Sequence, residues 1–247
     1  MSLARPSYWM RRLARNLGIA AVALVVHLVV VTQTSDSRDV MYRLSMATGY
    51  VSVALIAWAL LIGPWRVRRG RPAPASTDLR RDVGIWSALF GLAHVVTGLQ
   101  VHFGGKFWKY FLYPDGDHRI PVRVDLFGFA NWTGLAAALV LVLLLAISND
   151  ASLRTLGTRR WKSWQRWTYG AAALTVAHAL GYQIVATQEP RWIALFALIT
   201  IAVLAMQLDG RRRMLARRAA SSRGKLIDAE GAEECGDRGE PLSGRAR

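Results

Sequence analysis

The sequence predicts an all-α integral membrane protein, a bundle of six transmembrane helices with both termini in the cytoplasm. Three observations predict this fold. The 247 residues contain six apolar runs, each about long enough to cross the roughly 30 Å hydrocarbon core of a bilayer. Lysine and arginine gather in alternate loops. No Gly-x-Gly-x-x-Gly segment follows a predicted strand, so we expect no flavin or nicotinamide domain in the chain. The expected spans are 16–32, 46–63, 83–103, 126–147, 167–187 and 192–208.

The formal net charge of +16 predicts orientation in a membrane rather than binding to nucleic acid. With the N-terminus inside, residues 1–15 and the loops 64–82 and 149–166 hold 15 Lys and Arg residues, while the outer loops hold 7. This bias is the positive-inside pattern of a multi-pass protein of the inner or plasma membrane. The basic charge then serves topology and attraction to anionic membrane lipid.

The composition divides the chain into three segments. Residues 1–15 form a basic cytoplasmic lead, and residues 16–208 form the six-helix transmembrane domain. Within that domain, Gly63-Pro64 is a helix stop signal. Residues 209–247 mix charged clusters with Gly, Ser and Pro. Because such a segment cannot bury a core, we expect a disordered cytoplasmic tail.

Three histidines lie inside the predicted spans, at matched depth. His27, His94 and His178 each follow an arginine by 12 or 13 residues, which places each imidazole roughly 18–20 Å from the inner edge. The preceding arginines are Arg15, Arg81 and Arg166. Ionisable side chains inside a membrane are costly and indicate function. Two imidazoles at one depth suit the axial positions of a single iron porphyrin, and spacing alone offers three candidates for this pair.

Further candidate features surround the third span. Gly91 and Gly98 flank His94 on one helix face, where they permit close approach of either a neighbouring helix or a flat ring. His102 lies about 12 Å beyond His94, either as a solvated interfacial residue or in contact with haem propionates or a quinone. The outer loop 103–123 is rich in aromatic residues. It is typical of an aromatic belt, with a docking surface or the lip of a quinone site as alternatives.

Several motifs along the chain resemble a known family. They are Thr48-Gly49 with Gly63-Pro64, Arg80-Arg81-x-x-Gly84-x-Trp86 leading to His94, and Leu156-Gly157 with Trp161, Arg166, Tyr169 and His178. Together they resemble the ferric reductase-like transmembrane domain family. That family includes NADPH oxidases, ferric-chelate reductases and the haem-binding membrane subunit of the bacterial methionine sulfoxide reductase system. The last is the most similar in appearance, because it too lacks a fused flavin domain. The resemblance covers residues 46–187.

The resemblance implies that His94 and His178 are the axial ligands of a haem iron. Members with two haems carry a second histidine thirteen residues before each of these, where this chain has Arg81 and Gln165. Neither is an expected haem ligand, so we expect one b-type haem, in the outer half of the membrane. His27 and His102 remain secondary candidates for the site.

The expected function is therefore electron transfer through a membrane. Quinol within the membrane, or a separate reductase, would supply electrons, and a separate redox partner protein on the outer face would accept them. The chain would be at most the membrane redox subunit of an oxidoreductase system, with a quinone as a second candidate cofactor. Two other classes stay open: a transporter or proton-relay bundle that uses the three histidines, and a non-redox scaffold subunit. Against the proton relay, the apolar spans contain no Asp, Glu or Lys partner.

Overall fold

The computed structural model describes residues 8–35, 39–70, 78–113, 119–185 and 189–237. The helices are α1 (Tyr8–Gln33), α2 (Val40–Arg68), α3 (Asp78–Val101), α4 (Leu126–Ala146), α5 (Asp150–Gln165), α6 (Trp167–Val185) and α7 (Pro190–Asp237), with two 3-10 turns, η1 (Phe103–Gly105) and η2 (Phe107–Tyr110), before α4. Within these ranges there is no β-strand, and the one β-type pairing is an isolated antiparallel bridge from Leu112 to Val122. The predicted all-α class is confirmed.

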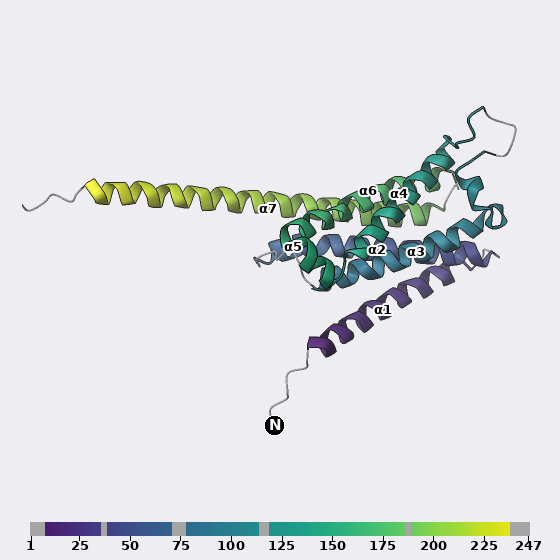
Figure 1. Ribbon diagram of the computed structural model, residues 1–247, viewed down its shortest axis with the longest axis horizontal. Coiled ribbons are helices and arrows are strands. Elements are labelled where there is room, and N and C mark those ends of the chain that lie inside the picture. Colours follow the sequence, from purple (N-terminus) through teal and green to yellow (C-terminus); the bar gives the residue numbers. More distant parts are fainter. Residues whose placement is uncertain (1–7, 36–38, 71–77, 114–118, 186–188, 238–247) are drawn as a thin grey trace, which may run out of the picture.

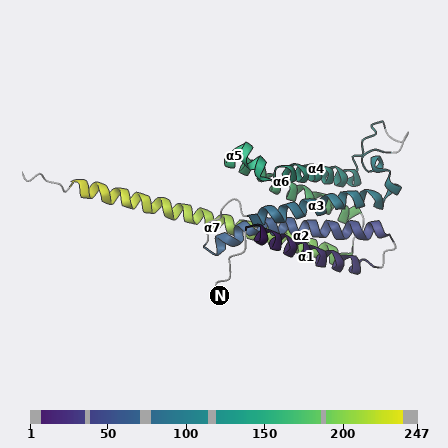
Figure 2. The same cartoon turned by 60° about the horizontal axis from the view of Figure 1, so that its bottom comes forward.

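Helices α1, α2, α3, α4, α6 and α7 run side by side, while α5 lies at one end of the bundle that they form (Figures 1 and 2). Helices α1, α2, α3, α4 and α7 are each long and apolar enough to cross a membrane. Helix α6 has 19 residues, includes the polar side chains of His178, Tyr182 and Gln183, and is not among these five. It packs closely along α4, where a Cβ atom on Gly181 would lie 2.7 Å from that of Ala130. The chain is a multi-pass helical membrane protein.

Helix α2 lies at the centre of the bundle. In its most apolar stretch 44% of the residues are buried, against 17% for α1 and 11% for α7. One buried cluster joins α1, α2 and α3, and another joins α2, α3, α4 and α6. Helices α1 and α7 therefore present most of their apolar surface to lipid, and the interior belongs to α2, α3, α4 and α6.

A buried carboxylate fastens α1 to α3 near their N-terminal ends. The side chain of Asp82 is 1% exposed and accepts a hydrogen bond from Arg15 Nε at 2.7 Å, with Arg12 3.5 Å away. Trp86 Nε1 donates to Asn16 Oδ1 at 3.0 Å beside it. Since a buried charge is tolerated only when it is paired, this network fixes how α1 meets α3. The sequence analysis did not identify Asp82.

The predicted helix stop at Gly63-Pro64 is wrong, because α2 continues to Arg68. Proline has no N–H, so Pro64 leaves the carbonyl of Leu60 without its helical donor. Gln207 of α7 supplies the missing donor, with Nε2 2.7 Å from Leu60 O. A side chain of the neighbouring helix α7 thus replaces the hydrogen bond that the proline removes.

This arrangement predicts the effect of Gln207→Leu. We expect the free energy of unfolding to fall by about 1–3 kcal/mol, because a buried carbonyl loses its donor. Thermal unfolding in detergent, followed by circular dichroism, measures the change. The matched control is Gln100→Leu, since Gln100 Nε2 donates to Val96 O within its own helix at an exposed position. That control should cost below about 0.5 kcal/mol; equal losses in both variants would contradict the role of Gln207.

The expected inner loop 149–166 is mostly the short helix α5. The Asn149 side chain caps its first turn, accepting a backbone N–H at 2.7 Å. Gly157 interrupts the helix with φ of +71°, a conformation that glycine adopts at little cost. Arg81 of α3 donates to Asp150 Oδ1 at 2.5 Å, and this contact holds the pKa of the Asp150 carboxyl below its usual range. Helix α5 is thereby fixed against the N-terminal end of α3.

Helix α7 extends well past residue 208, where the sixth span was expected to end, and runs beyond the bundle (Figure 1). Residues 209–247 were expected to be disordered, but the chain is helical as far as Asp237. Residues 238–247 lie outside the described residues. The membrane span has already nucleated the helix, and its extension is rich in Arg and Ala, which favour helix. Asp209 and Arg213 add an ion pair one turn apart, at 2.9 Å. The division into cytoplasmic lead, membrane domain and cytoplasmic tail stays a prediction.

Orientation in the membrane also stays a prediction, based on the arginine bias. Reporter fusions after Ser148 and after Asp209 should read as cytoplasmic, and a fusion near Asp115 should read as external. An external signal from the fusion at Asp209 would contradict an even number of spans.

Candidate functional site

Two of the predicted histidines face each other inside the bundle. The ring centroids of His94, on α3, and His178, on α6, are 5.9 Å apart, and the ring planes differ by 78°. Imidazoles bound to opposite sides of one metal ion have centroids about 6 Å apart, given metal–nitrogen bonds of roughly 2 Å. The planes need not be parallel, because each ring turns about its own metal–nitrogen bond. The pair is therefore spaced to share one metal centre.

Hydrogen bonds set the tautomer of both imidazoles. His94 Nδ1 lies 2.9 Å from the backbone oxygen of Ser45, on α2, and His178 Nδ1 lies 2.7 Å from that of Ala130, on α4. Because a carbonyl can only accept, each Nδ1 carries the proton, and each Nε2 keeps a lone pair. Carbonyl acceptors of this kind orient histidines that bind metals. Among the residues that the structure describes, every hydrogen bond made by these two imidazoles uses Nδ1.

A glycine lies beneath each imidazole. Gly49 follows Ser45 by four residues, and a Cβ atom there would lie 2.9 Å from His94 Nδ1. Gly134 follows Ala130 by four residues, and its Cβ would lie 2.5 Å from His178 Nδ1. The same device thus occurs twice, once between α2 and α3 and once between α4 and α6. The sequence analysis included Gly49 in a motif but missed Gly134, which the spacing of small residues in Ala130-x-x-x-Gly134 could have indicated.

The two glycines that flank His94 on α3 have different neighbours: one contacts another helix, and the other lies beside the histidine site. A Cβ on Gly91 would lie 2.9 Å from Leu141 Cδ1 and 3.1 Å from Ser52 Oγ, so this glycine serves helix packing. A Cβ on Gly98 would lie 3.2 Å from Ser45 Oγ and 4.0 Å from His94 Cε1, beside the histidine site.

The structure does not bring the two secondary candidates into the pair. The ring of His27 lies 6.5 Å from that of Phe90, and its buried Nδ1 has no hydrogen-bond partner in the described ranges. His102 follows the end of α3, with its ring 6.2 Å from Tyr110 and 6.0 Å from Phe127. Partial burial lowers the pKa of the His102 imidazole. Matched depth along three helices therefore did not mean proximity for all three histidines.

Aromatic side chains connect His178 to the loop 103–123. The Tyr182 ring is 5.0 Å from His178, and its hydroxyl donates to Asn131 Oδ1 at 2.8 Å. The buried Tyr110 donates its hydroxyl to Gly98 O at 2.9 Å, which folds the loop onto α3. Part of the loop 103–123 is thus structural rather than a membrane belt. Its large apolar side chains that are exposed, with Val124 just before α4, are Phe103, Phe107, Trp108, Leu112, Ile120, Val122 and Val124.

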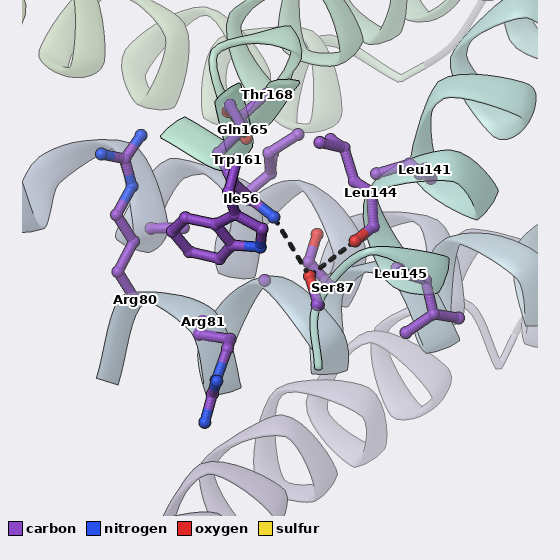
Figure 3. Close-up of a pocket in the computed structure, with 14 residues that line it drawn as sticks. Ile56, Arg80, Arg81, Ser87, Leu141, Leu144, Leu145, Trp161, Gln165 and Thr168 are labelled. Carbon is purple, nitrogen blue, oxygen red and sulfur yellow. Dashed lines mark hydrogen bonds between the residues drawn. The ribbon is translucent and has the colours of Figure 1, made fainter. Parts of the chain in front are cut away.

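A small cavity lies between the histidine pair and α5, lined by Arg81 and Gln165 among others (Figure 3). Its volume is about 60 Å³, whereas sites for drug-sized ligands occupy roughly 300–1,000 Å³. Gln165 Nε2 donates to Ser148 Oγ at 3.4 Å, and the indole of Trp161 stands among the lining residues (Figure 3). No imidazole is among the residues that line this cavity.

The fold and the site define a multi-pass helical membrane protein whose interior brings two imidazoles together, each with its Nδ1 next to a backbone carbonyl. The chain is similar to the protein-methionine-sulfoxide reductase heme-binding subunit MsrQ of Azospira oryzae, with 31% identity over 138 residues. The alignment covers 55% of this chain and 53% of that relative, so the chain matches about half of the relative's length. No family model matches the chain, and no solved structure matches it.

Proposed function

We propose that this chain is a haem-binding membrane subunit that transfers electrons, with one b-type haem held by His94 and His178. The observation that carries the proposal is the facing pair of imidazoles, 5.9 Å apart, each with Nδ1 held by a backbone carbonyl. In the described part of the chain, no group of three or more His, Cys, Asp or Glu residues is placed to hold a metal ion. Two imidazoles instead suit an iron whose other ligands come from a porphyrin.

The residues of the chain would bind, orient and insulate the haem. His94 and His178 would bond the iron through Nε2. The carbonyls of Ser45 and Ala130 would hold the rings in place and make them stronger ligands. The haem itself supplies the one-electron chemistry. Burial among apolar helices excludes water and, with the two ligands, sets the reduction potential.

The residues that line the inner cavity favour a count of one haem rather than two. Arg81 and Gln165 both line it, and their side chains are engaged with Asp150 and Ser148. A second haem at this level would need ligands that these two side chains do not provide.

The position of the histidine pair supports a donor within the membrane. His94 lies about 20 Å along α3 from Arg81, too deep for a soluble flavin to approach closely. Quinol dissolved in the bilayer, or a separate reductase with its own relay, would deliver the electrons. A separate redox partner protein on the outer face would accept them, consistent with the relative's name as a subunit. The exposed apolar side chains of the outer loop, such as Trp108, offer such a partner a surface. We place the protein in the inner or plasma membrane.

The test is haem content. The purified chain, expressed with adequate haem supply, should give a reduced-minus-oxidised spectrum of the b type and about one haem per chain in a pyridine haemochrome assay. A value of zero overturns the proposal and leaves the proton-relay bundle and the non-redox scaffold. A value near two overturns only the single-haem claim and directs attention to His27 or His102.

A further inference from the structure

Arg123 is a largely buried cation at the outer end of the bundle. Its side chain is 15% exposed. The guanidinium carbon lies 5.0 Å from the ring centroid of Phe127, 5.3 Å from that of Tyr113 and 5.7 Å from that of Phe103. Aromatic rings stabilise the cation by covering it, but they accept none of its N–H groups as a carboxylate does.

The hydrogen bonding of Arg123 is incomplete. Its buried Nε has no hydrogen-bond partner among the described residues. The carboxylate of Asp125 forms an ion pair with Arg123 but is also engaged in capping α4, since its Oδ1 accepts from Gly128 N at 2.7 Å. Its Oδ2 lies 3.7 Å from Arg123 Nε, beyond hydrogen-bond distance. A guanidinium carries five N–H donors, and an unmet buried donor is costly. The site therefore calls for a further acceptor.

A continuous row of rings joins Arg123 to the histidine pair. Phe127, which lies under the guanidinium, is 5.8 Å from Tyr182, and Tyr182 is 5.0 Å from His178. The Arg123 cation thus lies at one end of the row of rings, and His178, one of the two proposed iron ligands, lies at the other.

The backbone of Arg123 is held in place. Its N–H donates to Phe111 O at 2.8 Å, and its carbonyl accepts from Trp132 Nε1 at 3.2 Å. Gly128 packs directly against the same carbonyl, so closely that a Cβ atom there would collide with it. The backbone from which the Arg123 side chain extends is therefore fixed on both sides.

We propose that Arg123 binds the carboxylate of a haem propionate, so that the haem enters with its propionates toward the outer loop. This inference rests on the proposed function. A guanidinium and a carboxylate form a charge-assisted pair with two parallel hydrogen bonds. The aromatic rings cover the faces of the guanidinium, and the in-plane N–H groups remain for the carboxylate.

The test compares haem with haem dimethyl ester, whose propionates carry no charge. Full-length chain is prepared without haem, and each ligand is titrated while the absorption spectrum reports the dissociation constant. The wild type should bind haem about tenfold more tightly than the diester. Arg123→Gln should bring this ratio close to one, and Arg123→Lys should keep part of it.

The matched control is Arg43→Gln. Arg43 also has a buried Nε without a hydrogen-bond partner in the described ranges, but its NH2 group donates to Val31 O of α1 at 3.2 Å. This variant should keep the wild-type ratio. If both variants lose the preference for haem over the diester to the same extent, the preference comes from the overall positive charge of this end of the protein. That result would overturn the assignment to Arg123.

Two further outcomes overturn the proposal. If the wild type binds haem and diester equally, no propionate pair exists, and this result needs no variant to fold. If Arg123→Gln retains the wild-type ratio, Arg123 serves another acceptor, such as an acidic side chain of an outer partner. A wild-type chain that binds neither ligand overturns the proposed function itself, which is a separate and recognisable failure.

Discussion

His94→Ala and His178→Ala should each abolish bound haem or reduce it to a small fraction of the wild-type content. Each substitution removes one of the two axial bonds, and the surrounding site is too apolar to recruit a replacement ligand easily. The purified variants are compared by pyridine haemochrome content per chain, with far-ultraviolet circular dichroism as the check that the helices have formed.

The other histidines provide the controls for this experiment. His27→Ala should keep most of its haem, because His27 lies against Phe90 rather than against the pair. His102→Ala should also keep its haem, while its reduction potential is free to shift. If haem is lost with His27→Ala and retained with His178→Ala, the ligands come from α1 and α3, and the proposed pair is wrong.

The spans were predictable because a bilayer imposes a simple rule of length and hydrophobicity. Helix α5 was not, since it is polar and does not cross the membrane. The error at Pro64 has a different cause. The stop rule is local, and it was overridden by Gln207, which lies more than a hundred residues away along the chain. A rule based on one helix cannot include a donor on another.

The candidate site was predicted in part for a similar reason. Spacing along a helix gives the depth of a residue, so His27, His94 and His178 appeared equivalent. Depth does not give the direction in which a side chain points, and only the packing of α3 against α6 separates the pair from His27. The acceptors on Ser45 and Ala130 are backbone atoms of other helices. No side-chain pattern in the sequence predicts these carbonyl acceptors, although each is followed by a glycine four residues later.

Those glycines carry the last prediction, which concerns Gly134→Ala and Gly49→Ala. The added methyl group would lie 2.5 Å from His178 Nδ1 in the first variant and 2.9 Å from His94 Nδ1 in the second. Both distances are far below van der Waals contact, so each imidazole must leave its carbonyl acceptor or tilt away from its partner. We expect Gly134→Ala to lose most of its haem and Gly49→Ala to lose less, because its clash is milder.

The matched control is Gly84→Ala on α3, where an added Cβ meets nothing within 4 Å. Alanine favours helix over glycine by about 1 kcal/mol, so this variant should keep its haem and unfold at an equal or higher temperature. Haem content per chain and thermal unfolding are measured on all three variants. Full haem content in Gly134→Ala would show that His178 does not depend on close contact with α4. Loss of haem in Gly84→Ala as well would mean that any added methyl group in these helices disturbs haem binding. Loss confined to Gly134→Ala and Gly49→Ala would mean that haem binding depends on the contact between each imidazole and the neighbouring backbone.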